Sequence, residues 1–355
     1  MKKIVLAIMA AFTITAAQAQ DSLSTESWFK KNKVFQNLDL SVTAGTTGIG
    51  IDVASKIGDY VQLRAGYEYM PRFQKSLFFP VEVGGQPARQ YDADGNRIET
   101  RFDRLAKILT EVTGFQVQDE VEMVGKPTIN NFKFLVDVFP FKNNKHWHFT
   151  AGFYWGPSQF AYAENAITAS TSLVAVGLYN SMYYHAVYDL PIYEGTTVIT
   201  EEMRNKFLSY GRMGFPIGEF THDIYGYFKE DVYGEWGEVV HKAGEYGLIH
   251  YKGETYNMEP DADGTVRVRA KSNSFKPYLG FGYGGRLLKN RDDWHVSFDA
   301  GAMFWGGTPA LYTHDGINLT EDITNARGKV GDWIDLLSGV KVFPVLSVRF
   351  TKTKF

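Results

Sequence analysis

The chain has 355 residues, of which 44% are hydrophobic and 22% charged, and its formal net charge is −3. This mixed charge content argues against a disordered chain, and the near balance of signs argues against nucleic acid as a partner. The absence of cysteine excludes disulfides, thiolate metal ligands, cysteine nucleophiles and a lipidated cysteine anchor. Aromatic residues (15%) and 35 glycines favour β-structure with an unusual surface.

The N-terminus has the three parts of a secretory signal peptide. Lys2 and Lys3 form a basic start, residues 4–17 are apolar, and Ala17-Gln18-Ala19 is a small-x-small cleavage site. We therefore expect residues 1–19 to be removed on export. Residues 20–36 would then form a periplasmic N-terminal segment.

Alternation of apolar and polar residues dominates the rest of the chain. It covers eight segments: 38–44, 49–54, 61–69, 132–138, 147–155, 275–283, 294–304 and 342–350. Each segment is about ten residues long, which is the length that a tilted strand needs to cross a bilayer. The pattern predicts an all-β transmembrane protein, an eight-stranded antiparallel up-and-down barrel. A barrel of 10–12 strands is the alternative.

The two faces of these strands differ in chemistry. One face is apolar and aromatic, whereas the other holds glycine, hydroxyl residues and charge. Alternation alone does not say which face is outside, because a soluble barrel would bury the apolar one. Acidic and basic residues nearly balance on the polar face, which suits a narrow interior of paired ions. We therefore expect interior charges at Asp39, Asp52, Arg64, Glu68, Lys133, Asp137, Lys276, Asp299 and Arg349.

Tryptophans mark both ends of two strands. Trp147 and Trp294 begin their strands, and Trp155 and Trp305 end them. Along a tilted strand these levels are roughly 20–28 Å apart, close to the ~25 Å between the aromatic girdles of membrane barrels. The last residue, Phe355, is of the aromatic kind seen at the end of outer-membrane barrels. We expect a bacterial outer-membrane location, with lipid around the barrel.

The connections alternate between short and long. The joints 55–59, 141–146 and 285–293 are short, as expected of periplasmic turns. The long segments all fall on the opposite side, and we expect extracellular insertions at 71–127, 157–274 and 306–340 within a barrel domain of residues 37–355.

Segments of this length are expected to fold into a cap. Apolar residues at helical spacing predict an amphipathic helix near 97–113. Residues 173–187 are interpreted as a second helix, with a β-strand as the alternative. Thr200 and Gly211 have the positions of the N-terminal and C-terminal caps of a third helix.

Three motifs resemble ligand-binding sequences, but the residues around them do not support binding. Asp-Ala-Asp-Gly at 92–95 and at 261–264 favours hairpin turns over calcium sites, although Ca²⁺ binding stays open. The glycine-rich run 280–285 matches a dinucleotide fingerprint, but no helix follows it.

Histidines offer no better candidate for catalysis or metal binding. His295 and Ser297 are spaced like the pair of outer-membrane lipid A deacylases, but they lie near the periplasmic end and point inward. His146 and His148 lack an identifiable third metal ligand. We therefore predict no catalytic, cofactor-binding or metal-binding residues.

The strand pattern resembles the small eight-stranded outer-membrane barrels of the OmpA and OmpX type. The resemblance covers residues 38–70, 129–156, 275–305 and 341–355, and it rests on pattern rather than on an invariant motif. The insertions are longer than in that family, and no periplasmic domain follows the barrel.

Since most of the mature chain is expected outside the cell and no catalytic arrangement is found, we expect a surface protein in which the barrel anchors a cap that binds an extracellular ligand or protein partner, without catalysis. A narrow, porin-like conduit for small solutes is the first alternative. An outer-membrane lipid-modifying enzyme is the second.

Overall fold

A computed structural model describes residues 37–194, 197–228, 231–233, 239–250 and 252–354. The predicted signal peptide, the segment 20–36 and Phe355 lie outside these residues. None of the helices in the described part of the chain is long and apolar enough to cross a membrane.

Eight antiparallel strands, in chain order, form a closed barrel in which β1 pairs with β26. They are β1 (Leu38–Gly45), β2 (Gly48–Ile57), β3 (Val61–Tyr69), β10 (Asn130–Val138), β11 (Trp147–Trp155), β22 (Phe275–Leu288), β23 (Arg291–Phe304) and β26 (Val342–Lys354). The predicted fold class is confirmed, and the alternative of 10–12 strands is wrong. The joint expected at 285–293 is shorter than predicted, because β22 and β23 pair as far as Leu288 and Arg291.

The barrel has an apolar outside and a polar inside. Ile51 is 65% exposed, whereas the next residue, Asp52, is 2% exposed. Leu279 and Phe298 on other strands are 58% and 61% exposed. A protein surrounded by water does not leave a continuous belt of such side chains unburied, so this surface is that of a transmembrane barrel.

Three of the four predicted girdle tryptophans face outward. Trp147 and Trp155 are 40% and 37% exposed, and Trp294 is partly exposed. The prediction that Trp305 belongs to an outer aromatic girdle is wrong, because this residue is only 4% exposed. Trp305 is two positions after the inward-facing Met303, so the alternation of β23 points it into the barrel end, where it joins the cluster of Met303 and Val345. There its ring lies 4.5 Å from that of Phe160 and 5.5 Å from that of Phe343.

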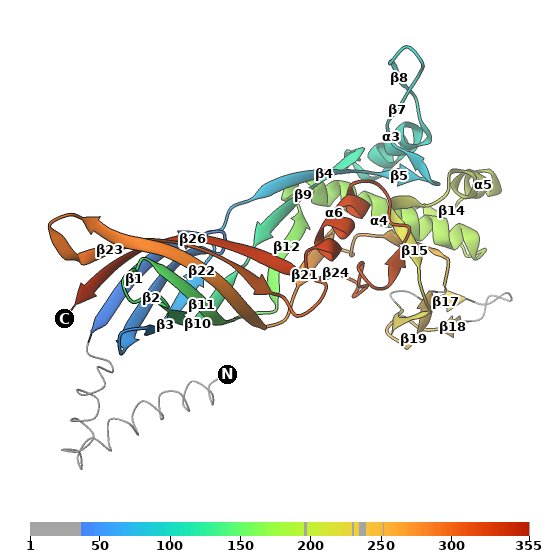
Figure 1. Cartoon of the computed structure of the whole chain (residues 1–355). Helices are drawn as coiled ribbons and strands as arrows, with labels where there is room; N and C mark the ends of the chain where they lie inside the picture. Colours follow the sequence, from blue (N-terminus) through green and yellow to red (C-terminus); the bar gives the residue numbers. More distant parts are fainter. Residues whose placement is uncertain (1–36, 195–196, 229–230, 234–238, 251, 355) are drawn as a thin grey trace.

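Residues 71–127, 157–274 and 306–340 form a head at the end of the barrel opposite Leu38 of β1 and Lys354 of β26 (Figure 1). Its first sheet has the order β24–β21–β12–β9–β4 and leads on directly from barrel strands. The members are β4 (Lys75–Pro80), β9 (Glu120–Pro127), β12 (Gln159–Asn165), β21 (Arg267–Lys271) and β24 (Ala310–Thr313).

The second sheet of the head has the order β20–β15–β5–β6, with β25 beside β15. Its strands are β5 (Glu82–Val83), β6 (Gln86–Pro87), β15 (Met213–Phe220), β20 (Thr255–Met258) and β25 (Ile323–Thr324). The described part of the head also contains four separate two-stranded sheets: β7 (Gln90–Tyr91) with β8 (Arg97–Ile98), β13 (Tyr193–Glu194) with β14 (Thr197–Val198), β16 (Ile224–Tyr227) with β19 (Tyr246–His250), and β17 (Val232–Tyr233) with β18 (Val239–His241).

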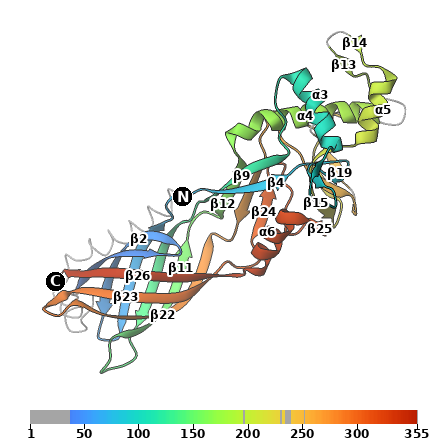
Figure 2. The same cartoon turned by 90° about the horizontal axis from the view of Figure 1, so that it is seen from above.

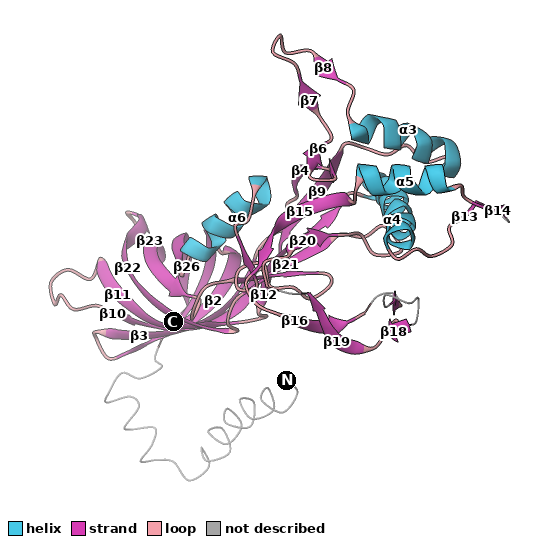
Figure 3. Ribbon diagram, turned by 90° about the vertical axis from the view of Figure 1, so that its right-hand side faces the viewer, coloured by secondary structure: helices cyan, strands magenta, loops and turns pink. Residues whose placement is uncertain are grey.

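Three helices gather at the far end of the head, while a fourth lies next to the barrel (Figures 2 and 3). They are α3 (Arg101–Thr113), α4 (Ile167–Val187), α5 (Glu201–Tyr210) and, beside the barrel, α6 (Gly328–Gly339). The head has its own hydrophobic core, which includes Leu105, Val176, Ile217 and Leu319.

The helices predicted from the sequence are present, with shifted ends. α3 begins only at Arg101, because Thr100 caps it: Thr100 Oγ1 accepts from the Asp103 amide at 3.3 Å. α4 begins earlier than predicted, and the β alternative for residues 173–187 is wrong. α5 has the expected caps at Thr200 and Gly211. α6 was not expected.

The two Asp-Ala-Asp-Gly turns differ. The first joins β7 to β8, and Asp92 Oδ1 accepts from the amides of Asp94 and Asn96 at 3.0 and 2.8 Å. The second is not a hairpin tip. β20 and β21 belong to different sheets, and Gly264 is buried against the Ser170 carbonyl of α4.

Candidate functional site

The barrel interior holds all nine charged residues expected there, each no more than 6% exposed. They come from seven of the eight strands. They are Asp39, Asp52, Arg64, Glu68, Lys133, Asp137, Lys276, Asp299 and Arg349.

One cation holds two carboxylates together. Lys133 Nζ on β10 lies 2.5 Å from Glu68 Oε1 on β3 and 2.9 Å from Asp52 Oδ1 on β2. All three side chains are nearly unexposed, so each charge depends on its partners rather than on water.

A second network crosses the middle of the barrel. Asp137 lies 2.9 Å from Arg64 NH2 and 3.5 Å from Arg349 NH1, and it accepts a hydrogen bond from Thr150. Arg349 NH2 also lies 3.4 Å from Asp299 Oδ1, which is 2.6 Å from His148 Nε2. These contacts join β3, β10, β11, β23 and β26 across the barrel.

Asp39 and Lys276 stand apart from these networks. Asp39 accepts from Gln62 and Thr353, both at 2.6 Å. Lys276 Nζ contacts only the side-chain oxygen of Asn131, at 3.3 Å, among the described hydrogen bonds and ion pairs. Burial inside the barrel therefore does not guarantee an ion partner.

An apolar cluster closes the head end of the barrel. It contains Leu135, Tyr154, Tyr278, Met303, Trp305 and Val345, all buried. The glycines of the dinucleotide-like run make room for the large side chains. A Cβ at Gly280 would clash with the Tyr278 hydroxyl, and one at Gly282 would clash with His148. The run is thus part of the packed interior.

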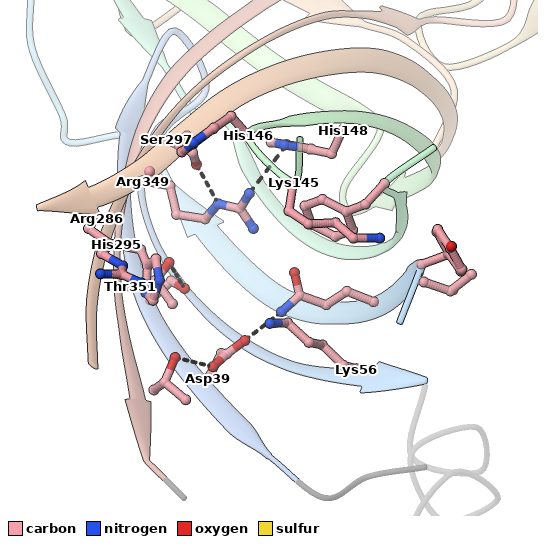
Figure 4. A pocket seen from close by; sticks show the side chains of 18 of the residues that line it. Asp39, Lys56, Lys145, His146, His148, Arg286, His295, Ser297, Arg349 and Thr351 are labelled. Carbon is pink, nitrogen blue, oxygen red and sulfur yellow. Dashed lines mark hydrogen bonds between the residues drawn. The ribbon is translucent and has the colours of Figure 1, made fainter. Parts of the chain in front are cut away.

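A pocket of about 630 Å³, which we call the terminal pocket, lies at the other end of the barrel, where Asp39 and Thr353 are (Figure 4). The connections after β2 and β10 and the last part of β22 line it, and Arg349 lies at its inner side. Its lining residues include Asp39, Lys56, Lys145, His146, His148, Arg286, His295, Ser297, Arg349 and Thr351.

Two polar residues of this pocket, Ser297 and His146, have hydrogen-bond partners within the barrel. Ser297 Oγ accepts from Arg349 Nε at 3.0 Å and donates to Asp299 at 3.1 Å, so its partners are not an imidazole. His146 Nδ1 lies 2.6 Å from the Gly284 carbonyl oxygen. Within the described ranges, no three His, Asp or Glu side chains lie close enough together to hold a metal.

The head contains a second cavity of about 380 Å³, between its two sheets and α6. Most of its lining is apolar and comes from all three inserted segments. Representative residues are Leu77, Phe79, Val121, Met123, Phe160, Ile217, Val268, Leu311, Trp333, Ile334 and Leu337. We call this cavity the head cleft. The sequence did not predict it, since it needs segments from distant parts of the chain side by side.

Charged side chains border the head cleft. Four are cationic, and one, Glu82, is acidic. Burial raises the pKa of the Glu82 carboxyl, and the nearby charge of Arg327 partly offsets this. Lys329 Nζ donates to the Phe78 carbonyl oxygen at 2.9 Å and so joins α6 to β4. The other two cations are Lys75 and Lys126.

No protein-family model and no curated protein sequence matches this chain. The crystal structure of Acinetobacter baumannii CarO2 aligns with 90% of this chain and 98% of its own, at 14% identity and a TM-score of 0.35. The crystal structure of Acinetobacter baumannii CarO aligns with 89% and 97%, at 12% identity and a TM-score of 0.34. Likeness at this level does not bear on function, and the barrel follows from the strand pairing of the chain itself.

Proposed function

We propose that this protein resides in a bacterial outer membrane, where its barrel anchors the head outside the cell for binding a ligand or partner, without catalysis. The observation that carries the proposal is a contrast within the molecule. Between the 630 Å³ pocket and the head, the barrel interior is filled by ion networks and an apolar cluster, whereas the head has its own core and a cleft. An interior this full favours an anchor over a conduit.

The orientation follows from the lengths of the connections. The joints at the end of the barrel with the 630 Å³ pocket are short, and the three inserted segments are at the other end. Outer-membrane barrels keep short turns in the periplasm and long segments outside. The exposed apolar belt supplies the contact with lipid.

Epitope tags test this orientation. A tag at Gly95, an open hairpin tip with no heavy atom near its Cβ position, should be reached by antibody on intact cells. Matched tags at Asn143 and Asn290, in exposed turns at the other end, should be reached only after permeabilisation. Gly264 is unsuitable, because it is packed against α4. The reverse labelling pattern would place the head in the periplasm and exclude binding at the cell surface.

A further inference from the structure

Two strands and one helix supply matching walls of the head cleft. On β9, Val121, Met123 and Gly125 share one face, because strand residues two apart point the same way. Their partners on β4 are Phe79, Leu77 and Lys75, respectively. On α6, the lining residues Val330, Trp333, Ile334 and Leu337 have the spacing of a single helix face.

Gly125 leaves room inside the cleft that a side chain would occupy. A Cβ at this position would meet nothing closer than the Lys75 carbonyl oxygen at 3.5 Å. Large apolar side chains at the cleft are also left open: Phe73 is 58% exposed and Trp333 is 40% exposed. Apolar surface left unfilled and exposed in this way is typical of a binding site.

The charges around the cleft favour a negatively charged ligand. Lys75, Arg327 and Lys329 oppose a single carboxyl, Glu82. Lys126 also borders the cleft, but it alternates with Gly125 and its Nζ lies over the Tyr162 ring. Lys75 has no ion pair among the described residues, and Arg327, 72% exposed, lies 3.8 Å from its nearest carboxylate, Glu219. Lys75 and Arg327 are thus available to an anionic group next to an apolar cavity.

We propose that the head cleft binds a single-chain anionic amphiphile of the fatty-acid class. The alkyl chain would lie against Val121, Met123 and the space over Gly125, with the carboxylate at Lys75. About 380 Å³ is at the small end of the range for small-molecule sites, which suits one alkyl chain rather than a two-chain phospholipid. This inference rests on the proposed role of the head in binding.

Binding of radiolabelled dodecanoate to the mature protein in lipid nanodiscs tests the proposal, with empty nanodiscs as the blank. Gly125→Trp should fill the cleft and weaken binding at least about tenfold. Val124→Trp adds the same bulk on the other face of β9 and should bind like the unmodified protein. Lys75→Glu should weaken dodecanoate several-fold, whereas Lys107→Glu, on α3, should not.

Measurements on the unmodified protein do not depend on any variant folding. Affinity should rise by about fourfold per methylene from octanoate to dodecanoate, since each buried methylene contributes a roughly constant free energy. Dodecanol, which lacks the charge, should compete poorly. Equal competition by dodecanol, or no dependence on chain length, would show that the cleft does not select an anionic amphiphile.

Two further outcomes separate this inference from the proposed function. If the purified protein retains a phospholipid that dodecanoate does not displace and that Gly125→Trp removes, the cleft belongs to membrane lipid and the inference is wrong. If dodecanoate does not bind although the Gly95 tag is accessible on intact cells, the inference fails while the surface location stands.

Discussion

Lys133 and Lys276 are both almost completely buried inside the barrel, but only Lys133 has carboxylates next to it. Lys133 holds Asp52 and Glu68, whereas Lys276 has only the Asn131 amide oxygen. Lys133→Met should therefore destabilise the barrel by about 3–5 kcal/mol, because it leaves two buried carboxylates without a cation. Lys276→Met should change stability by about 1 kcal/mol or less, because it replaces a buried charge that has no counter-ion.

The temperature at which the folded barrel loses its compact mobility on an SDS gel measures this difference. The two variants share the substitution and the environment of the barrel wall, so each serves as the control for the other. Equal effects of the two substitutions would contradict the assignment of the Lys133 network.

A surface carboxyl of the head gives stability that depends on pH. Arg89 donates to Asp119 at 2.6 and 2.8 Å, and these hydrogen bonds hold the pKa of the carboxyl below its ordinary value. A pKa lower in the folded than in the unfolded state stabilises the fold above the unfolded value, about 3.9, and this stability is lost as pH falls through the folded value. Asp119→Asn should thus destabilise the head at neutral pH and lose its effect in strong acid.

The expected size is about 1 kcal/mol or less, since Arg89 is partly exposed and solvent screens the pair. All helices of the described chain lie in the head, so the helical circular-dichroism signal follows head unfolding. Asp94→Asn, at an exposed hairpin tip, is the control. A constant difference between variant and parent from neutral to acidic pH would argue against the Asp119 linkage.

At the scale of elements, α3 depends on its capping box. Thr100 Oγ1 accepts from the Asp103 amide, the Asp103 carboxylate accepts from the Thr100 amide at 2.8 Å, and Thr100 Oγ1 also donates to the Ala88 carbonyl. Thr100→Ala should lower head stability by about 1 kcal/mol or somewhat more. Thr100→Ser keeps the hydroxyl and should restore most of it. The helical circular-dichroism melting curve measures both, and equal losses would mean that the cap contributes nothing.

At the scale of the whole molecule, the packed interior predicts that the barrel does not conduct. The Arg349 network and the cluster around Tyr154 and Tyr278 fill the space between the terminal pocket and the head. Purified protein in planar bilayers should show no steady single-channel current, with a known porin as the positive control. A steady current would favour the conduit alternative instead.

The barrel could be predicted from the sequence because its signal is local. Side chains of a strand alternate between its two faces, so the residue types within each of the eight segments indicate which face lies against lipid. This local signal is sufficient to assign nine charged residues to the barrel interior without information on how the strands pair. The caps of α3 and α5 are equally local, since an N-cap acts on amides two or three residues away.

Only the tertiary structure decided the rest, because it depends on contacts between segments far apart in the chain. Trp305 has the parity of the inward-facing Asp299 and Met303, so the alternation of β23 already argues against a place in the outer girdle, and the tertiary structure adds only the Phe160 and Phe343 rings that its ring contacts. Gly264 has the sequence of an open turn and is covered by α4. The head cleft needs α6 against β4, joined by a hydrogen bond between residues 251 positions apart, and no local period records such a contact.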